Sequence, residues 1–241
     1  MILHRNIHWK GGADMEFSIH PIATMRSDFP TKFGIPRQSG LVGSLRSTIV
    51  FEPEFRNPDA LRGLADFSHI WLIWQFSEAV RSQWTPTVRP PRLGGNTRMG
   101  VFATRSPFRP NSLALSCVRI IGLEQTEENG TVIHVAGADL MDGTPIFDIK
   151  PYIPYSDSHP EALGGFTSTA KDYLLQVDFP QNLLEVLPKD KQEAVLELLS
   201  HDPRPSYQAQ SDRIYGLSFA GFDIRFSVEN DVLHVKEIVA L

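Results

Sequence analysis

Residues Leu113–Ala138, LALSCVRIIGLEQTEENGTVIHVAGA, contain the pattern that decides the fold. Two mostly apolar runs rich in β-branched residues, LALSCVRII and TVIHVAGA, flank the turn Glu128-Asn129-Gly130. Asn-Gly accepts positive φ angles at low cost, and such a turn between two strand-like runs is typical of a β-hairpin. The stretch therefore predicts two antiparallel strands.

Short runs of the same kind recur through the first part of the chain. They read FSIHPIAT, LVGSLRSTIV, HIWLIWQF and MGVFAT, and glycine, proline or polar turns bound them. One helix is predicted here, over Asp59–Phe67, because it follows Pro58 and because Leu61 and Leu64 share a helical face. Many strands with few helices predict a mainly β fold, either a barrel or a sandwich.

The last third of the chain has a different composition. Residues 151–165, rich in Pro, Tyr, Ser and Gly, predict a linker. The strand-like DYLLQVDF precedes a predicted helix over 181–200, in which leucines and valine recur at three- and four-residue spacing, and IYGLSFA, FDIRFSV and VLHVKEIV predict three further strands. We therefore expect a dispensable tail at 1–15, a β domain at 16–160 and a small α+β domain at 161–241.

The composition is that of a soluble globular protein, with 41% hydrophobic and 21% charged residues among 241. The longest apolar run, Ile70–Phe76, is too short to cross a bilayer, and the first residues show no secretory signal, so we expect no membrane partner. The single cysteine, Cys117, excludes an internal disulfide and fits a reducing cytoplasm. Its apolar neighbours predict a buried thiol. With one cysteine and no histidine cluster, we expect no metal site.

An arginine-rich segment interrupts this ordinary composition. Residues 88–111 read VRPPRLGGNTRMGVFATRSPFRPN, and residues 79–123 contain no Asp or Glu, although the whole chain has a net charge of −5. Arginine without lysine favours planar, hydrogen-bonded recognition of phosphate or carboxylate groups. The segment therefore indicates a surface that receives an anion. The alternative is a solvated loop whose arginines pair with acids distant in sequence.

Three loops share a mixture of glycine, proline and a few charged groups. They are GIPRQSGL at 34–41, RMGVFATRSPFRPNSL at 98–113 and ADLMDGTP at 138–145. Proline fixes φ and glycine permits unusual φ, so loops of this kind present backbone groups in set directions. Each alone is compatible with a plain turn, but the three together favour a ligand site on a rigid scaffold.

At these positions the chain resembles the TsaA-like family of S-adenosylmethionine-dependent tRNA methyltransferases, and most closely its bacterial members. The resemblance rests on PRQSGLV, FSHIWLIWQF, VRPPRLGGNTRMGVFATRSPFRPNSLALS, ADLMDGTPIFDIKPY and, late in the chain, DPRPSY. It implies a β-barrel that binds S-adenosylmethionine, usually as a homodimer, with a small α+β C-terminal domain. The implied reaction is N6-methylation of N6-threonylcarbamoyladenosine next to the anticodon of threonine tRNA. A cytoplasmic enzyme with no DNA partner is expected.

The resemblance also implies which residues hold the cofactor. Arg37 or Arg105 could pair with its carboxylate, Asp139 or Glu78 could hold its amine or ribose hydroxyls, and backbone groups around Asp139 could bind adenine. Where the family commonly has His-Gln at the end of a strand, this chain has Ser-Glu. The implied cofactor residues are Pro36, Arg37, Gln38, Ser77, Glu78, Arg105, Leu115, Ala138, Asp139 and Leu140.

Methyl transfer from a sulfonium depends on alignment, but the target amine must still lose a proton. From its place in DLMDGTP, Asp142 is the first candidate base, with His69 second. For tRNA, arginines are the natural phosphate contacts, Asn111 could bind a base edge, and Phe108 could stack on an unpaired base or simply pack. The phosphate-binding candidates are Arg81, Arg89, Arg92, Arg98 and Arg109. Two other functions remain open, a non-catalytic RNA-binding barrel and a methyltransferase acting on a substrate other than tRNA.

Overall fold

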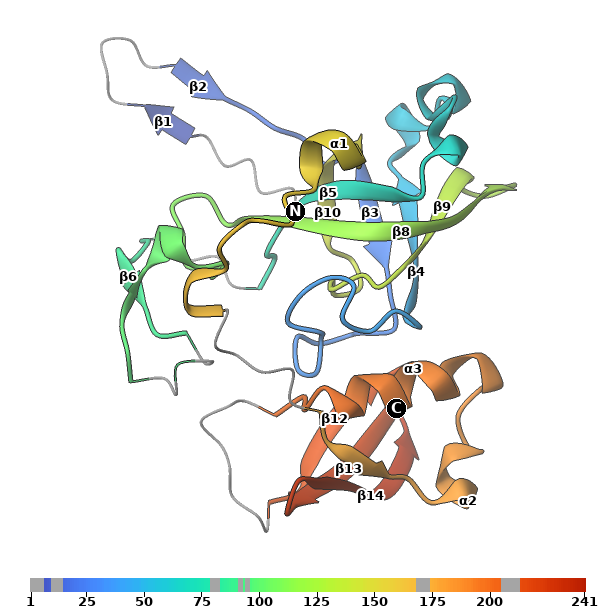
Figure 1. Cartoon of the computed structure of the whole chain (residues 1–241). Coiled ribbons are helices and arrows are strands. Elements are labelled where there is room, and N and C mark those ends of the chain that lie inside the picture. The colour runs from blue at the N-terminus through green and yellow to red at the C-terminus, as the bar shows by residue number, and fades with distance from the viewer. Residues whose placement is uncertain are drawn as a thin grey trace.

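The computed structural model describes residues 7–9, 15–78, 83–90, 93, 96–167, 174–204 and 213–241. Strands predominate among them, as predicted, and they form a barrel with a smaller lobe beside it (Figure 1). Within the described residues, no helix is long and apolar enough to cross a membrane.

Six antiparallel strands close into the barrel in the order β10-β3-β4-β9-β8-β5. The predicted hairpin is confirmed, because Thr126 pairs with Gly130 and Gly130 has a φ of 67°. A barrel strand not predicted separately follows the ADLMDGTP loop. The strands are β3 (Ala23–Arg26), β4 (Arg46–Phe51), β5 (His69–Gln75), β8 (Leu113–Thr126), β9 (Gly130–Ala136) and β10 (Pro145–Pro151).

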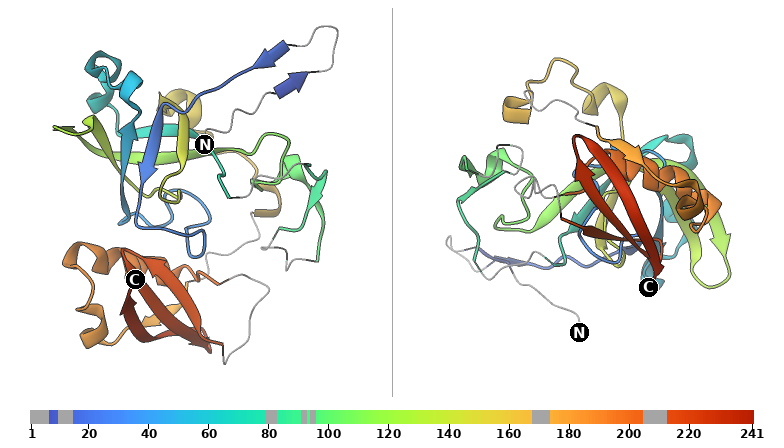
Figure 2. Two further views of the ribbon diagram at one scale, coloured as in Figure 1. Left: turned by 180° about the vertical axis from the view of Figure 1, so that it is seen from behind. Right: turned by 90° about the horizontal axis from the view of Figure 1, so that it is seen from below.

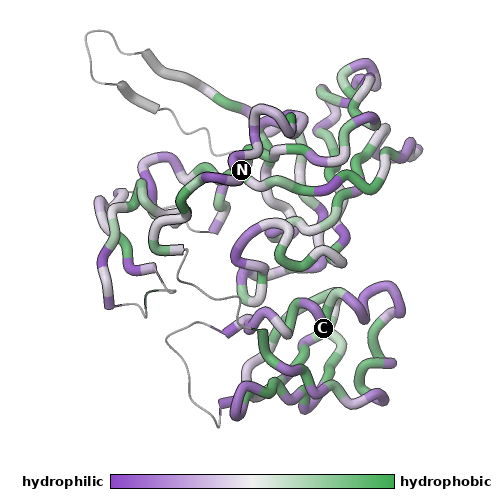
Figure 3. The backbone as a smooth tube through the Cα atoms, in the orientation of Figure 1, coloured by the Kyte–Doolittle hydropathy of each residue, from purple (hydrophilic) through white to green (hydrophobic). Residues whose placement is uncertain are grey.

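Alternating side chains fill the barrel interior. On β5, Ile70, Leu72 and Trp74 are buried, while the residues between them are partly exposed. This period of two is the pattern of a strand with one face on the core. Apolar residues, green in Figure 3, recur along these strands and through the C-terminal lobe.

The C-terminal lobe is a four-stranded sheet covered by a helix. Its strand order is β11-β14-β13-β12, and β11 runs parallel to β14. Leu198 and Leu199 of the helix join one hydrophobic cluster with Leu217 and Phe226 of the sheet. The elements are β11 (Gln176–Asp178), α2 (Gln181–Leu184), α3 (Lys189–Ser200), β12 (Tyr215–Phe219), β13 (Phe222–Glu229) and β14 (Val232–Ala240).

Two helix predictions were wrong in their extent. The predicted helix over 59–67 is two short 3-10 helices, Pro58–Leu61 and Leu64–Asp66, because Gly63 between them has a φ of 83°. The predicted helix over 181–200 is broken into α2 and α3 because Pro188, the residue before α3, has a non-helical ψ of 141°.

The smaller elements also differ from the predictions. The run MGVFAT is β7 (Met99–Gly100), paired with β6 (Thr87–Val88), followed by the 3-10 helix Val101–Ala103. Cys117 is only partly buried, since strand alternation turns it away from the barrel interior. Two further 3-10 helices are Pro53–Phe55 and Gly165–Thr167.

The regions predicted to be a tail and a linker both contain regular secondary structure that the sequence did not indicate. In the region expected to be a dispensable tail, β1 (Ile7–Trp9) pairs with β2 (Met15–Phe17), and this pair projects away from the barrel (Figure 2). The predicted linker contains the end of β10 and the short helix α1 (Pro154–Asp157).

Residues 27–45, which connect β3 to β4 and are called the strap from here on, lie against the C-terminal lobe (Figure 1). Phe29, Val42 and Leu45 of the strap are buried in the hydrophobic cluster of the lobe. Gly34 lies so close to Leu217 that a Cβ atom would fall 2.1 Å from its Cδ1. The strap therefore shares its core with a lobe that follows it by more than a hundred residues in sequence.

Candidate functional site

A cavity of about 510 Å³ lies at the end of the barrel where β5 ends and β8 begins. Residues from three segments surround these strand ends. The segments are the strap, residues 104–109 and the loop after β9. They belong to the three loops in which glycine and proline predicted a shared ligand site. The volume is that of a typical small-molecule site.

All but two of the predicted cofactor residues line this cavity. Ala138 and Leu140 do not, because both are buried in the barrel core, on either side of Asp139. The structure thus brings both candidate arginines and both candidate carboxylates to one cavity. The predicted residues that line it are Pro36, Arg37, Gln38, Ser77, Glu78, Arg105, Leu115 and Asp139.

Asp139 is held in place by a chain of hydrogen bonds from inside the barrel. Trp74 Nε1 donates to Ser116 Oγ over 2.9 Å, and Ser116 Oγ donates to Asp139 Oδ1 over 2.6 Å. Burial raises the pKa of the Asp139 carboxyl above its usual value, although Ser116 and the positive charge of Arg105 act in the opposite direction. A cationic ligand in the cavity would stabilise the ionised form of this carboxyl.

Arg105 and Arg37 connect the cavity to its surroundings in different ways. Arg105 Nη1 donates a hydrogen bond to Gln38 Oε1, so the arginine-rich segment is joined to the strap. Arg37 Nη2 donates to the backbone oxygen of Arg204 over 3.2 Å, which joins the strap to the DPRPSY motif of the C-terminal lobe. Both guanidinium groups remain exposed enough to bind an anion.

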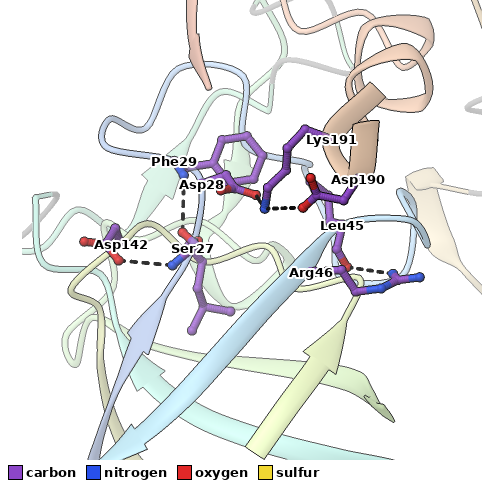
Figure 4. Close-up of polar contacts among 9 residues, drawn as sticks. Ser27, Asp28, Phe29, Leu45, Arg46, Asp142, Asp190 and Lys191 are labelled. Carbon is purple, nitrogen blue, oxygen red and sulfur yellow. Dashed lines mark hydrogen bonds and ion pairs between the residues drawn. The ribbon is translucent and has the colours of Figure 1, made fainter. Parts of the chain in front are cut away.

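The C-terminal lobe fixes both ends of the strap. At one end, Lys191 of α3 forms a 2.6 Å ion pair with Asp28 (Figure 4). At the other, Glu197 of α3 accepts bonds from Gly43 N and Ser44 N, each over 3.0 Å, and from Ser44 Oγ. Burial alone would raise the pKa of Glu197, but these hydrogen bonds outweigh it and lower the pKa below its usual value.

The structure brings neither candidate base to the cavity. Asp142 accepts a 3.0 Å bond from Ser27 N (Figure 4). It also faces Arg26 over 3.7 Å, and so holds the start of the strap. His69 lies at the opposite end of β5 from the cavity, where it pairs with Arg119. Among the described residues that line the cavity, the carboxylates are those of Glu78 and Asp139.

The predicted tRNA contacts are divided. Arg109 lines the cavity, where its Nη1 donates to the backbone oxygen of Thr104 over 3.0 Å, and Phe108 beside it is partly buried. Arg89, Arg98 and Asn111 are exposed. Arg81 and Arg92 lie outside the described residues.

Several residues that line the cavity were not predicted. Trp74 and Phe76 form a tilted ring pair with centroids 4.5 Å apart, and Ser116 is the buried polar residue that holds Asp139. The signal for Ser116 was available, because a serine at an inward position of an apolar strand needs a polar partner. The others not predicted are Lys32, Ile35, Thr104, Pro107, Leu113, Ala114, Met141 and Thr144.

Family comparisons cover nearly the whole chain. Residues 24–158 match the family described as tRNA-methyltransferase O N-terminal domain, and residues 172–241 match the TrmO C-terminal domain. The first match contains the strap and the loops that line the cavity, and the second contains α3 and its sheet.

Individual relatives agree with this assignment. The tRNA (adenine(37)-N6)-methyltransferase of Escherichia coli (strain K12) is 38% identical over 220 residues, which cover 88% of this chain and 93% of that protein. The crystal structure of TrmO from Pseudomonas aeruginosa matches with a TM-score of 0.77 at 31% identity, over 94% of this chain and 99% of that one. A "Probable S-adenosyl-L-methionine-binding protein" of Methanothermobacter thermautotrophicus is 38% identical over 146 residues, which cover 61% of this chain and 97% of its own. The chain therefore belongs to the TrmO family of S-adenosylmethionine-dependent tRNA (adenine-N6)-methyltransferases.

Proposed function

We propose that this enzyme methylates the N6 nitrogen of N6-threonylcarbamoyladenosine next to the anticodon of threonine tRNA, as a cytoplasmic homodimer. The observation that carries the proposal is the convergence of Arg37, Arg105 and Asp139 on one cavity beside an arginine-rich segment without acids. The cavity suits a small ligand with charges of both signs, and the segment suits a polyanion.

The donor groups of the cavity fit S-adenosylmethionine. Asp139 is a carboxylate whose pKa is raised by burial, so it gains most from a cationic neighbour such as the cofactor amine or sulfonium. Arg105 and Arg37 have exposed guanidinium groups that suit the cofactor carboxylate. Trp74 and Phe76 offer apolar surface for the adenine ring.

When bound, S-adenosylmethionine supplies a methyl group on a sulfonium, ready for in-line displacement by a nitrogen. The contribution of this chain is to align the two reactants and to exclude water from them. We assign Asp139 to the cofactor, which leaves Glu78, exposed at the rim of the cavity, to take up the proton of the amine. Asp142 and His69 take no part in this scheme because the strap and the far end of β5 hold them elsewhere.

The test uses purified protein, methyl-labelled S-adenosylmethionine and two preparations of threonine tRNA, one with and one without the threonylcarbamoyl group. A different tRNA that carries the same nucleoside is tested beside them. After digestion, mass spectrometry of the nucleosides should find one added methyl group on threonylcarbamoyladenosine alone. Methylation of unmodified adenosine to the same extent, or equal methylation of another tRNA carrying the same nucleoside, would contradict the proposed substrate. Sedimentation of the free protein tests the dimer.

A protein or small-molecule substrate is separated from tRNA by a salt titration. Binding to tRNA through several arginines should weaken steeply as ionic strength rises, because each neutralised phosphate releases counterions. If the protein does not bind tRNA even at low salt, a protein or small-molecule substrate is favoured.

A further inference from the structure

Two aromatic rings are stacked on each other at the protein surface close to the cavity. The rings of Trp84 and Phe102 have centroids 6.0 Å apart and an interplanar angle of 24°. Trp84 is 47% exposed and Phe102 is 71% exposed. Among the ring pairs of the described residues, this is the pair in which both rings are exposed. A stack that stays largely in water contributes little to a core, so the pair needs another explanation.

The local backbone holds the two rings together. The β6–β7 ladder pairs Thr87 with Gly100, which brings the residues flanking both strands side by side. Val101 N donates to Pro86 O over 2.9 Å, and the Val101 side chain is 1% exposed. The hairpin is therefore anchored through Val101, while its neighbour Phe102 points into solvent.

The pair lies next to the rim of the cavity. Thr104 lines the cavity and follows Phe102 by two residues, a separation of at most about 7 Å along the backbone. The ring pair and the cavity are therefore close enough for neighbouring nucleotides of one RNA strand to reach both.

The charge around the rings identifies the occupant. Arg89 and Arg98 are exposed on the same hairpin, and residues 79–123 contain no Asp or Glu. Aromatic faces beside arginines, without acids, are the combination that binds single-stranded nucleic acid, because bases stack on the rings and phosphates pair with the guanidinium groups. A protein partner with an apolar surface would not require this excess of positive charge.

We propose that Trp84 and Phe102 form a stacking surface for an unpaired base of the RNA substrate, adjacent to the adenine that enters the cavity. The base lies on the outer face of Phe102, and Trp84 supports that ring from behind. Arg89 and Arg98 bind the neighbouring phosphates. This inference rests on the proposed function, since it takes the substrate to be the anticodon loop of a tRNA.

The test compares three variants with a matched control in the full chain. Trp84→Ala and Phe102→Ala remove a ring, Phe102→Leu keeps apolar area without a ring, and Tyr155→Ala removes a ring that is 91% exposed on α1. Binding of a fluorescent anticodon stem-loop with the threonylcarbamoyl group is followed by anisotropy, and S-adenosylmethionine binding by calorimetry. The three hairpin variants should bind RNA roughly tenfold more weakly, with cofactor affinity and melting temperature unchanged. Tyr155→Ala should bind RNA as the wild type does.

The possible results separate this inference from the proposed function. If the wild type methylates the RNA and all three variants bind it normally, the stacking surface is overturned and the function stands. If Phe102→Leu binds as tightly as the wild type, the ring face is not what the RNA contacts, and the inference is also overturned. If Trp84→Ala or Phe102→Ala changes the sedimenting mass, the rings belong to a contact between copies of the chain, and the inference is overturned. If the wild type neither binds nor methylates the RNA, the inference and the function fall together.

Discussion

The strap and the described residues between 83 and 112, called the arm from here on, both contribute residues to the cavity, but they are held in different ways. The strap buries Phe29, Val42 and Leu45 in the core of the C-terminal lobe and is bound at both ends by α3. The arm buries Val101 but exposes Trp84, Phe102 and several arginines.

This difference suggests a division of labour. A segment fixed at both ends can present groups to a small cofactor with little loss of conformational entropy on binding. A segment that exposes rings and guanidinium groups is suited to a large polyanion, which approaches from solvent. We therefore expect changes in the strap to affect the cofactor and changes in the arm to affect RNA.

Arg105 is the residue that joins the two regions, so its replacement should have the largest effect. Arg105→Ala removes the bond to Gln38 and the positive charge near Asp139. We expect the kcat/KM for S-adenosylmethionine to fall roughly 100-fold, from the loss of charge-assisted hydrogen bonds. Arg105→Lys should recover little, because an ammonium lacks the planar fork. Arg62→Ala, at an exposed ion pair with Asp59, is the control. Full activity of Arg105→Lys would contradict this role.

Glu197 tests whether the C-terminal lobe positions the strap. Glu197→Ala removes three hydrogen bonds to Gly43 and Ser44. The dissociation constant of S-adenosylmethionine should rise roughly tenfold, and the free energy of unfolding should fall by about 1–2 kcal/mol. Glu193→Ala, at an exposed position of the same helix, should leave both unchanged.

The pH dependence of stability gives Glu197 a second test. Its pKa is lowered in the folded protein, so its contribution is present above the unfolded pKa and is lost as pH falls through the folded pKa. Denaturant titrations of the wild type and Glu197→Ala should therefore converge in acid. A stability difference that stays constant down to low pH, or normal cofactor affinity of the variant, would show that Glu197 does not position the strap.

Gly137 tests the contact between the strap and the loop after β9. Its φ is 73°, and a Cβ atom there would lie 3.2 Å from Gly40 Cα, whereas Gly143 has a φ of 75° with open space around it. Gly143→Ala should cost about 1–2 kcal/mol for the left-handed backbone alone. Gly137→Ala should cost more, as judged by thermal unfolding, and should weaken cofactor binding a few-fold by displacing the strap. Equal effects of the two substitutions would show that the contact carries no energy.

Arg98 should have the smallest effect and should act on RNA alone. Arg98→Ala removes one exposed phosphate contact, so the slope of log K against log salt should decrease by about one and tRNA affinity should fall a few-fold. Cofactor affinity should stay unchanged, and Arg62→Ala should alter neither quantity. A change in cofactor affinity would mean that the arm and the strap do not have separate roles in binding.

Local sequence patterns predicted most of the barrel. The strand-like run that forms β5 and the Asn-Gly turn between β8 and β9 depend on a few neighbouring residues, and both predictions were confirmed. The break at Pro188 could also have been predicted, since a proline inside a helix lacks the backbone N–H that would continue the hydrogen-bond ladder. The strap could not, because its contacts with α3 join residues separated by more than 150 positions.

The prediction of the catalytic base from the sequence was limited in a similar way. In an irregular loop, sequence alone does not say whether Asp139 or Asp142 turns toward the cavity. The orientation of the two carboxylates depends on residues distant in sequence. Ser116 of β8 donates a hydrogen bond to Asp139, and the backbone N of Ser27 in the strap donates one to Asp142. The position of His69 could have been predicted from the sequence. It starts a strand, so it lies at the opposite end of that strand from Ser77.

The most direct test of the account is a calorimetric titration of S-adenosylmethionine into the wild type, Asp139→Asn and Asp142→Asn across a range of pH. Asp139→Asn should weaken binding by roughly 100-fold, because it removes the charge that faces a cationic ligand. Wild-type affinity should decrease as pH falls through the raised pKa of Asp139, since the protonated carboxyl offers no charge, and the variant should lose this dependence. Asp142→Asn should bind as the wild type does. Normal binding by Asp139→Asn together with lost binding by Asp142→Asn would contradict the account.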